Sequence, residues 1–141
     1  MLDLDSKFGR VVKRHIKNEY FIWLTTVDSK GTPQPRPVWF IWEDESFLIF
    51  SQPNAYKVKH IHNNPKVSLH FNTEDEAGEK HVIVFVGEAS FDTGVPPANK
   101  IPAYFRKYKA GVEGLNSTPD EFDREYSTAI RIKPTEVRGW V

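Results

Sequence analysis

The stretch "WLTTVDSKGTPQPRPVWFIWEDESFLIFSQPNAYKVKHIHNNPKVSLHF", residues 23–71, decides the fold. In its first half, two runs rich in β-branched and aromatic residues flank the turn sequence "DSKGT" (28–32). This pattern predicts a hairpin of strands 20–27 and 33–42. The acidic turn "EDE" (43–45) then leads into a third strand, "SFLIFS" (46–51). Connections this short favour antiparallel pairing.

The second half of the stretch predicts a helix that begins near Asn54. Asn54 is a good N-cap residue, and Ala55, Val58 and Ile61 follow at roughly helical spacing. The first turn holds Lys57, although a cation at the positive end of a helix dipole costs roughly 0.3–1 kcal/mol. Two interpretations are open: a lysine on a solvated helix face, or a lysine that complements a phosphate bound at the helix N-terminus.

The remaining segments complete a small antiparallel barrel. We expect three further helices: one over 6–18 capped by Ser6, one over about 98–110, and a short one that begins at the capping-box pair Thr118 and Glu121. We also expect strands over 66–72 and 81–92, and a last strand over 127–140 broken at Pro134. The predicted fold class is mainly β (α+β): a six-stranded antiparallel split β-barrel with peripheral helices, forming a single domain over residues 1–141.

The composition excludes several classes of function. Lysine plus arginine and aspartate plus glutamate number 19 each, so no bulk charge attracts nucleic acid or an anionic membrane. The absence of cysteine excludes disulfides, thiolate catalysis and cysteine-ligated metals. The sequence has no apolar run of membrane length and no signal-peptide pattern, so we expect a cytoplasmic protein.

The charges are unevenly distributed along the chain. Residues 29–42 and 46–73 contain no aspartate or glutamate, although they hold five cationic side chains and three histidines. A local anion site is therefore expected on this part of the surface. Ser51, at the end of the strand before Lys57, is expected to add a hydroxyl to it.

The segment "PQPRPVWFIW" predicts an edge strand. Its prolines at 33, 35 and 37 lack amide donors, which excludes a central position in a sheet. Alternation places Arg36, Val38, Phe40 and Trp42 on one face and Pro37, Trp39 and Ile41 on the other. An edge with free backbone groups and aromatic neighbours could dock a planar heterocycle. Alternatively, Trp39, Phe40 and Trp42 are core or dimer contacts.

Motifs for acid–base, nucleophilic or metal chemistry are missing. His60 and His62 lie two residues apart and would point to different sides of a helix, so no metal site is predicted. No phosphate-loop, dinucleotide-binding or hydrolase motif is present. An anion site without such residues suggests that a cofactor carries the chemistry.

Residues 23–71 resemble the core of the pyridoxamine 5'-phosphate oxidase-like superfamily of FMN-binding split β-barrels, and most closely its deazaflavin (coenzyme F420)-dependent oxidoreductases. The resemblance rests on "G-x-P-x-x-x-P-V-W-F", the strand ending in "FS", Lys57 and "NNP", and it extends from about Phe8 to Arg138. It implies a homodimer with cofactor at the subunit interface. The cofactor-binding residues that it implies are Arg36, Pro37, Val38, Trp39, Phe40 and Ile41 along the ring, Phe50 and Ser51 beside the ribityl chain and phosphate, and Tyr56 and Lys57 at the phosphate.

Departures from the family pattern narrow the expected reaction. This chain resembles the pyridoxamine phosphate oxidases proper but departs from their pattern in two places. Those enzymes carry cations at the positions of Ile41 and Tyr56, and they have a C-terminal Arg-x-His where this chain ends "VRGWV". Oxidation of vitamin B6 is therefore not expected. The resemblance implies an oxidoreductase that transfers a hydride between a bound deazaflavin (F420) and a small organic acceptor.

Three alternatives remain open at this point. The first is an FMN-dependent reductase or oxidase of the same fold. The second is a non-catalytic protein that binds or carries a flavin-like cofactor, since no catalytic residue can be named. The third is haem binding, as in another branch of the superfamily, with His60 or His81 as the ligand. Other residues that could line an acceptor pocket, or simply pack, are His62, Tyr104, Phe105, Tyr108 and Trp140.

Overall fold

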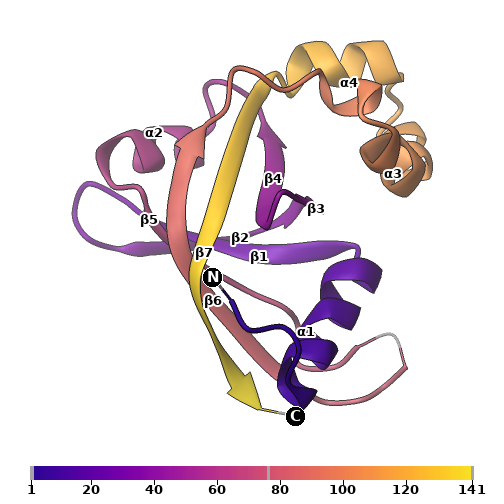
Figure 1. Cartoon of the computed structure of the whole chain (residues 1–141). Coiled ribbons are helices and arrows are strands. Elements are labelled where there is room, and N and C mark those ends of the chain that lie inside the picture. The colour runs from indigo at the N-terminus through magenta and orange to yellow at the C-terminus, as the bar shows by residue number, and fades with distance from the viewer. Residues whose placement is uncertain (1, 76, 141) are drawn as a thin grey trace.

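The computed structural model describes residues 2–75 and 77–140, which form one curled antiparallel sheet with helices around it (Figure 1). The elements in chain order are α1 (Lys7–Asn18), β1 (Phe21–Val27), β2 (Pro33–Trp39), β3 (Ile41–Glu43), β4 (Ser46–Ser51), α2 (Tyr56–Asn63), β5 (Lys66–His70), β6 (Val82–Phe91), the 3₁₀ turn η1 (Ala98–Lys100), α3 (Pro102–Gly114), α4 (Pro119–Glu125) and β7 (Thr128–Trp140). Among the described residues, no helix is both long and apolar enough to cross a membrane.

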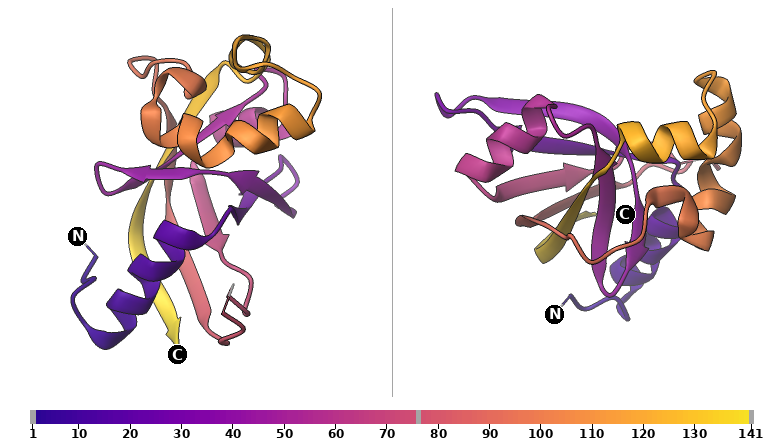
Figure 2. Two further views of the ribbon diagram at one scale, coloured as in Figure 1. Left: turned by 90° about the vertical axis from the view of Figure 1, so that its right-hand side faces the viewer. Right: turned by 90° about the horizontal axis from the view of Figure 1, so that it is seen from above.

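The strand order β2-β1-β5-β6-β7-β4-β3 places consecutive strands β2 and β3 at opposite edges of the sheet. Because only Phe40 separates these two strands in the chain, the sheet must curl until its edges approach each other (Figure 2). Every strand pair is antiparallel, which confirms the predicted split-barrel architecture. β2 pairs only with β1 within the described residues, as its three prolines predict.

The sheet has seven strands instead of the expected six, because the segment 33–42 is interrupted at Phe40. The amide of Phe40 donates to the Tyr108 hydroxyl at 2.8 Å, and its carbonyl accepts from Lys107 Nζ at 2.9 Å. Side chains of α3 thus satisfy the backbone groups that a continuous ladder would have used. These partners are 67 or 68 residues away in the chain, so the local pattern could not reveal the break.

Local signals placed the starts of α1 and α4 correctly. Ser6 Oγ accepts from the Gly9 amide at 2.9 Å, and Thr118 Oγ1 accepts from the Glu121 amide at 3.2 Å, so both predicted caps are confirmed. The cap of α2 was predicted wrongly: Ala55 occupies the N-cap position, and no side chain caps the helix.

Two further boundaries differ from expectation. The helix expected over 98–110 begins with η1 and continues as α3 to Gly114, with Pro102 as its first residue. β7 passes through Pro134 without ending, because the ladder with β6 shifts register between Val86 and Gly87. The shift leaves Thr135 unpaired beside Pro134, and a bulge is a place where a strand tolerates the missing amide donor of proline.

The hydrophobic core has two parts. The barrel interior holds the apolar face of α1 through Val12 and that of α2 through Ile61, packed on the inner face of the sheet. The second part lies between the sheet and the pair α3 and α4, around Tyr104, Tyr108 and Phe122. The predicted alternation in segment 33–42 is confirmed here: Val38 and Phe40 belong to the first part, whereas Trp39 and Ile41 belong to the second.

Candidate functional site

A cleft of about 800 Å³ lies between the β1–β2 hairpin and the N-terminal end of α2. Residues of both strands of the hairpin line one side of the cleft, and residues of the loop after β4 line the other. The lining residues are Leu24, Thr26, Asp28, Gln34, Arg36, Pro37, Gln52, Asn54, Ala55, Tyr56, Lys57 and His60.

The N-terminus of α2 opens into this cleft. Its N-cap residue, Ala55, has extended backbone and offers no side-chain acceptor, and the first turn holds no acidic residue. The first amides of a helix have no acceptor within the helix, and the dipole adds a positive potential there. This end of α2 therefore favours an anion.

Lys57 brings a cation to the same place. Its side chain is half-buried, and Nζ lies 3.4 Å from Ser51 Oγ. Burial, together with the nearby Arg36 guanidinium, lowers the pKa of Lys57 from its ordinary value. Both effects disfavour the charged form, and a bound anion would reverse them.

Arg36 supplies a second cation from β2. Its Nη1 donates to the carbonyl of Pro35 at 3.2 Å, and its side chain is exposed. Across residues 2–75 and 77–140, neither Arg36 nor Lys57 forms an ion pair. Two unpaired cations beside an uncapped helix end are the features that favour binding of a phosphate-sized anion.

Asp28 is the acidic residue of the cleft, and the hairpin turn occupies its carboxylate. One oxygen accepts from the amides of Lys30 and Thr32 at 2.9 Å, and the other accepts from Gln34 Nε2 at 3.1 Å. The pKa of Asp28 is lowered mainly by the hydrogen bonds from Thr32 and Gln34, so its carboxyl group is ionised at neutral pH. Asp28 thus fixes the shape of the hairpin beside the two cations.

The two histidines of α2 point to different sides, as their spacing predicts. His60 lines the cleft, where its Nδ1 lies 2.8 Å from Thr26 Oγ1. His62 instead stacks on Phe91, with ring centroids 4.4 Å apart. Tyr56 stands at the mouth of the cleft with 76% of its surface exposed, and so offers a flat ring to an occupant.

The structure brings half of the predicted cofactor residues together. The cleft is lined by Arg36, Pro37, Tyr56 and Lys57, and the Ser51 hydroxyl contacts the Lys57 ammonium.

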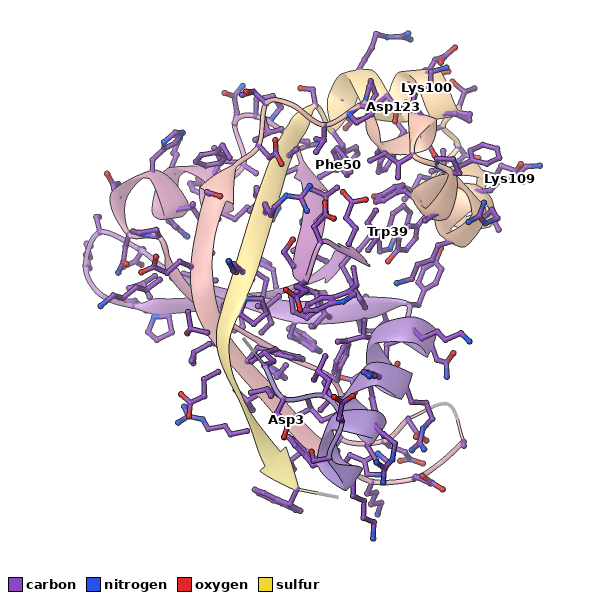
Figure 3. The ribbon with its side chains drawn as sticks, viewed as in Figure 1. Asp3, Trp39, Phe50, Lys100, Lys109 and Asp123 are labelled. Atoms are coloured by element: carbon purple, nitrogen blue, oxygen red, sulfur yellow. The ribbon has the colours of Figure 1, made fainter. Side chains whose placement is uncertain are left out.

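The side chains of the other five predicted residues lie elsewhere. Val38 and Phe40 point into the barrel, and Trp39, Ile41 and Phe50 point into the second core, where Figure 3 shows Trp39 and Phe50 on the side of α3 and α4. Trp39 stacks on Tyr108, with ring centroids 4.6 Å apart. Only their backbone could reach an occupant of the cleft, so their role stays a prediction.

Sequence reasoning missed the contribution of β1. Leu24, Thr26 and Asp28 alternate along the strand and its turn, so they share one face and line the cleft. That alternation was visible in the sequence, but which side of the hairpin would face α2 was not. Gln52 and Asn54 were also missed, because they enter through the loop that positions α2.

Two of the five residues considered for an acceptor pocket are packed in the core. Tyr104 and Tyr108 are 1% and 0% exposed and belong to the second core, whereas Trp140 is 68% exposed at the end of β7. His81, considered as a haem ligand, is only 8% exposed and faces His15 at 2.9 Å. It is therefore not the exposed axial ligand that haem binding was expected to need.

Comparison with known families gives one match. The family model described as pyridoxamine 5'-phosphate oxidase matches residues 9–141, nearly the whole chain. No protein of curated function matches the sequence.

Solved structures share the architecture at low sequence identity. An F420 reductase superposes with a TM-score of 0.67 at 19% identity, covering 89% of this chain and 94% of its own. The heme storage protein HutZ from Vibrio cholerae gives 0.65 at 18% identity, covering 92% of each chain. A FAD-binding protein from Mesorhizobium loti gives 0.68 at 14% identity, covering 95% of this chain and 92% of its own. At these identities the likeness establishes the fold.

Proposed function

The chain belongs to the pyridoxamine 5'-phosphate oxidase family, and from this premise we propose that it is an oxidoreductase that transfers a hydride between bound deazaflavin (F420) and a small organic acceptor. Proteins of this family bind flavins, and an F420 reductase is among the structures that share the fold. The observation that carries the proposal is the pair of unpaired cations, Arg36 and Lys57, at the uncapped end of α2.

The residues present fit a phosphorylated ring cofactor. The positive end of the cleft matches a phosphate group, while Pro37 and Tyr56 offer apolar and flat surface next to it. The cleft is open on one side in the single chain, and in our proposal a second copy of the chain closes it as a homodimer. Cofactor sites of this size combine apolar walls with a few polar groups that fix orientation.

The role of each residue follows from its place. Lys57 and Arg36 would bind the phosphate, with Ser51 as a hydrogen-bond partner beside Lys57. The backbone of β2 near Val38 and Trp39, on the sheet edge, would run along the ring and orient it. Deazaflavin, when bound, supplies hydride chemistry at its C5 carbon. The protein then contributes binding, orientation and electrostatics.

The cation count favours a deazaflavin over FMN. The phosphate monoester of FMN carries up to two negative charges, whereas the phosphodiester of F420 carries one. Of the positions where the pyridoxamine phosphate oxidases proper carry additional cations, Ile41 is buried in the second core and Tyr56 is uncharged. A reduced set of cations suits the singly charged phosphodiester better. The same reasoning argues against vitamin B6 oxidation here.

Paired equilibrium titrations of cofactor-free protein, one with F420 and one with FMN, test the proposal. We expect F420 to bind at micromolar concentration or below, and more tightly than FMN, followed by its absorbance and by intrinsic tryptophan fluorescence. Reduced F420 is then mixed with planar conjugated acceptors, and its reoxidation is followed with and without protein.

The outcomes separate the alternatives. Tighter FMN binding would assign the chemistry to a flavin. Tight F420 binding without acceleration of reoxidation by any acceptor would identify a carrier instead of an enzyme. Binding of neither cofactor would refute the proposal.

A further inference from the structure

A second polar cluster shares no residue with the cleft. It joins His15 of α1, Asp75 in the connection between β5 and β6, and His81 just before β6, where Figure 1 shows α1 beside that connection. The three side chains are 1%, 9% and 8% exposed, respectively. Two buried histidines and a nearly buried carboxylate are an unusual combination in a core.

The three facing atoms have the spacing of metal ligands. His15 Nε2 lies 2.9 Å from His81 Nδ1 and 3.9 Å from Asp75 Oδ2, and His81 Nδ1 lies 3.8 Å from the same oxygen. The point equidistant from all three atoms lies in their plane and is about 2.1 Å from each, within the roughly 2.0–2.2 Å of zinc–nitrogen and zinc–oxygen bonds. A tetrahedral ion with a fourth ligand lies outside that plane, so the Asp75 oxygen must move towards the two rings and the rings must separate slightly to keep these bond lengths.

Each histidine also has a carboxylate at its other ring nitrogen. His15 Nδ1 lies 3.3 Å from Glu19 Oε1, and His81 Nε2 lies 3.6 Å from Glu79 Oε2. Metal-bound histidines commonly hold their second nitrogen against a carboxylate, which fixes the tautomer and strengthens the ligand. The cluster therefore has a carboxylate close to the outer nitrogen of each ring, although neither contact has hydrogen-bond geometry.

The local charge leaves a net excess of carboxylate. Arg14 lies 2.9 Å from Glu79 Oε2 and 3.5 Å from Asp75 Oδ2, and so offsets one negative charge. The two carboxylates Asp75 and Glu79 therefore face one guanidinium. A bound divalent cation would neutralise this excess negative charge.

The buried cluster adjoins a small surface hollow. A hollow of about 100 Å³ is lined by Arg14, His15, Asn18, Glu19, Asp75 and Ala77. An ion could enter by this route, and a water molecule could occupy the fourth position of a tetrahedral site.

We propose that His15, Asp75 and His81 bind one divalent transition-metal ion of the zinc class, which ties α1 to the β5–β6 connection. Without metal, the two rings share a single hydrogen bond between His15 Nε2 and His81 Nδ1. Metal binding replaces that bond with two nitrogen ligands and fixes helix and loop together. The site would stabilise the end of the barrel that lies away from α3 and α4.

Titration of untagged, chelator-treated protein with Zn²⁺ tests this proposal. We expect one saturable site by calorimetry and a rise in Tm, and we expect Co²⁺ to give the intense visible absorption of tetrahedral coordination. Two variants, Asp75→Asn and His81→Gln, should each bind Zn²⁺ at least about tenfold more weakly, since even outer-partner changes cost 10–100-fold in affinity. His62→Gln, an exposed histidine on α2, is the matched control and should bind like the wild type.

Asp75→Asn keeps the experiment decisive if His81→Gln does not fold. Its amide oxygen can still accept from Ala77 and Glu79, as Asp75 Oδ1 does at 3.0 and 2.9 Å, so the loop is preserved while the ligand charge is lost. Far-UV circular dichroism without metal checks folding. The proposal is overturned if no site of unit stoichiometry is found, or if Asp75→Asn binds Zn²⁺ as tightly as the wild type.

Discussion

Gly111 of α3 packs directly against the indole ring of Trp39, so that a β-carbon at this position would lie 2.9 Å from two ring carbon atoms. The Tyr20 hydroxyl approaches the same point. Glycine is the only residue that lets α3 approach β2 this closely, although it weakens the helix by roughly 1 kcal/mol relative to alanine. Close packing therefore takes precedence over helix propensity at this position.

Gly111→Ala is expected to destabilise the protein. The added methyl group must displace Trp39 from its stack on Tyr108, and overpacking of this kind costs about 1–3 kcal/mol. Gly114→Ala, in the last turn of the same helix, meets nothing within 4 Å and should be neutral or stabilising by up to about 1 kcal/mol. Urea denaturation of both variants measures the difference. Equal stability of the two variants would contradict the packing argument.

Tyr108→Phe is expected to lower the free energy of unfolding by about 1–3 kcal/mol. The Tyr108 hydroxyl accepts from the Phe40 amide at 2.8 Å and donates to the Tyr20 carbonyl at 2.6 Å, so its loss leaves buried backbone groups unpaired. Tyr126→Phe is the control, because its hydroxyl makes no hydrogen bond with the described residues. The free energy of unfolding of Tyr126→Phe should lie within about 0.5 kcal/mol of the wild-type value. An equally small change for Tyr108→Phe would show that the break at Phe40 does not depend on the Tyr108 hydroxyl.

Lys107 predicts a pH dependence of stability. Burial lowers its pKa to about 8, against an ordinary value of 10.5. Between these values the unfolded chain binds a proton that the folded chain has released, so the free energy of unfolding should rise with pH from about 8 upward. Lys107→Met should lose this rise.

The comparison is made between pH 7 and 9.5. Burial raises the pKa of Tyr104 and Tyr108, which would lower stability at higher pH through their ionisation in the unfolded chain. Both tyrosines are present in wild type and variant, so the difference between the two curves reports Lys107. Parallel curves would mean that Lys107 titrates normally.

The elements that the sequence predicts well are those specified by neighbouring residues. The Ser6 and Thr118 caps depend on contacts within three residues, and the edge position of β2 follows from the missing amides of its own prolines. The break at Phe40 depends on α3, almost seventy residues away, and no local pattern reports such a contact.

The same distinction applies to the two candidate sites. Lys57 was conspicuous because its charge conflicts with the dipole of its own helix, which is a local signal. His15 and His81 are 66 residues apart and become neighbours only when α1 docks on the barrel. Their pairing could not be inferred without the sheet topology, which is why the sequence predicted no metal site.

Lys57→Ala is expected to weaken F420 binding roughly 10- to 150-fold, since losing a charge-assisted phosphate contact costs roughly 1.5–3 kcal/mol. Lys59→Ala, an exposed lysine two residues along α2 that does not line the cleft, should bind within about twofold of the wild type.

Because the pKa of free Lys57 is lowered by burial and by Arg36, wild-type affinity should fall as alkaline pH removes its proton, whereas Lys57→Ala should show a flatter profile. Affinities measured by F420 fluorescence at several pH values give both results. An affinity for Lys57→Ala within twofold of the wild type at neutral pH would place the phosphate elsewhere, and an unchanged pH profile would exclude Lys57 as the titrating group.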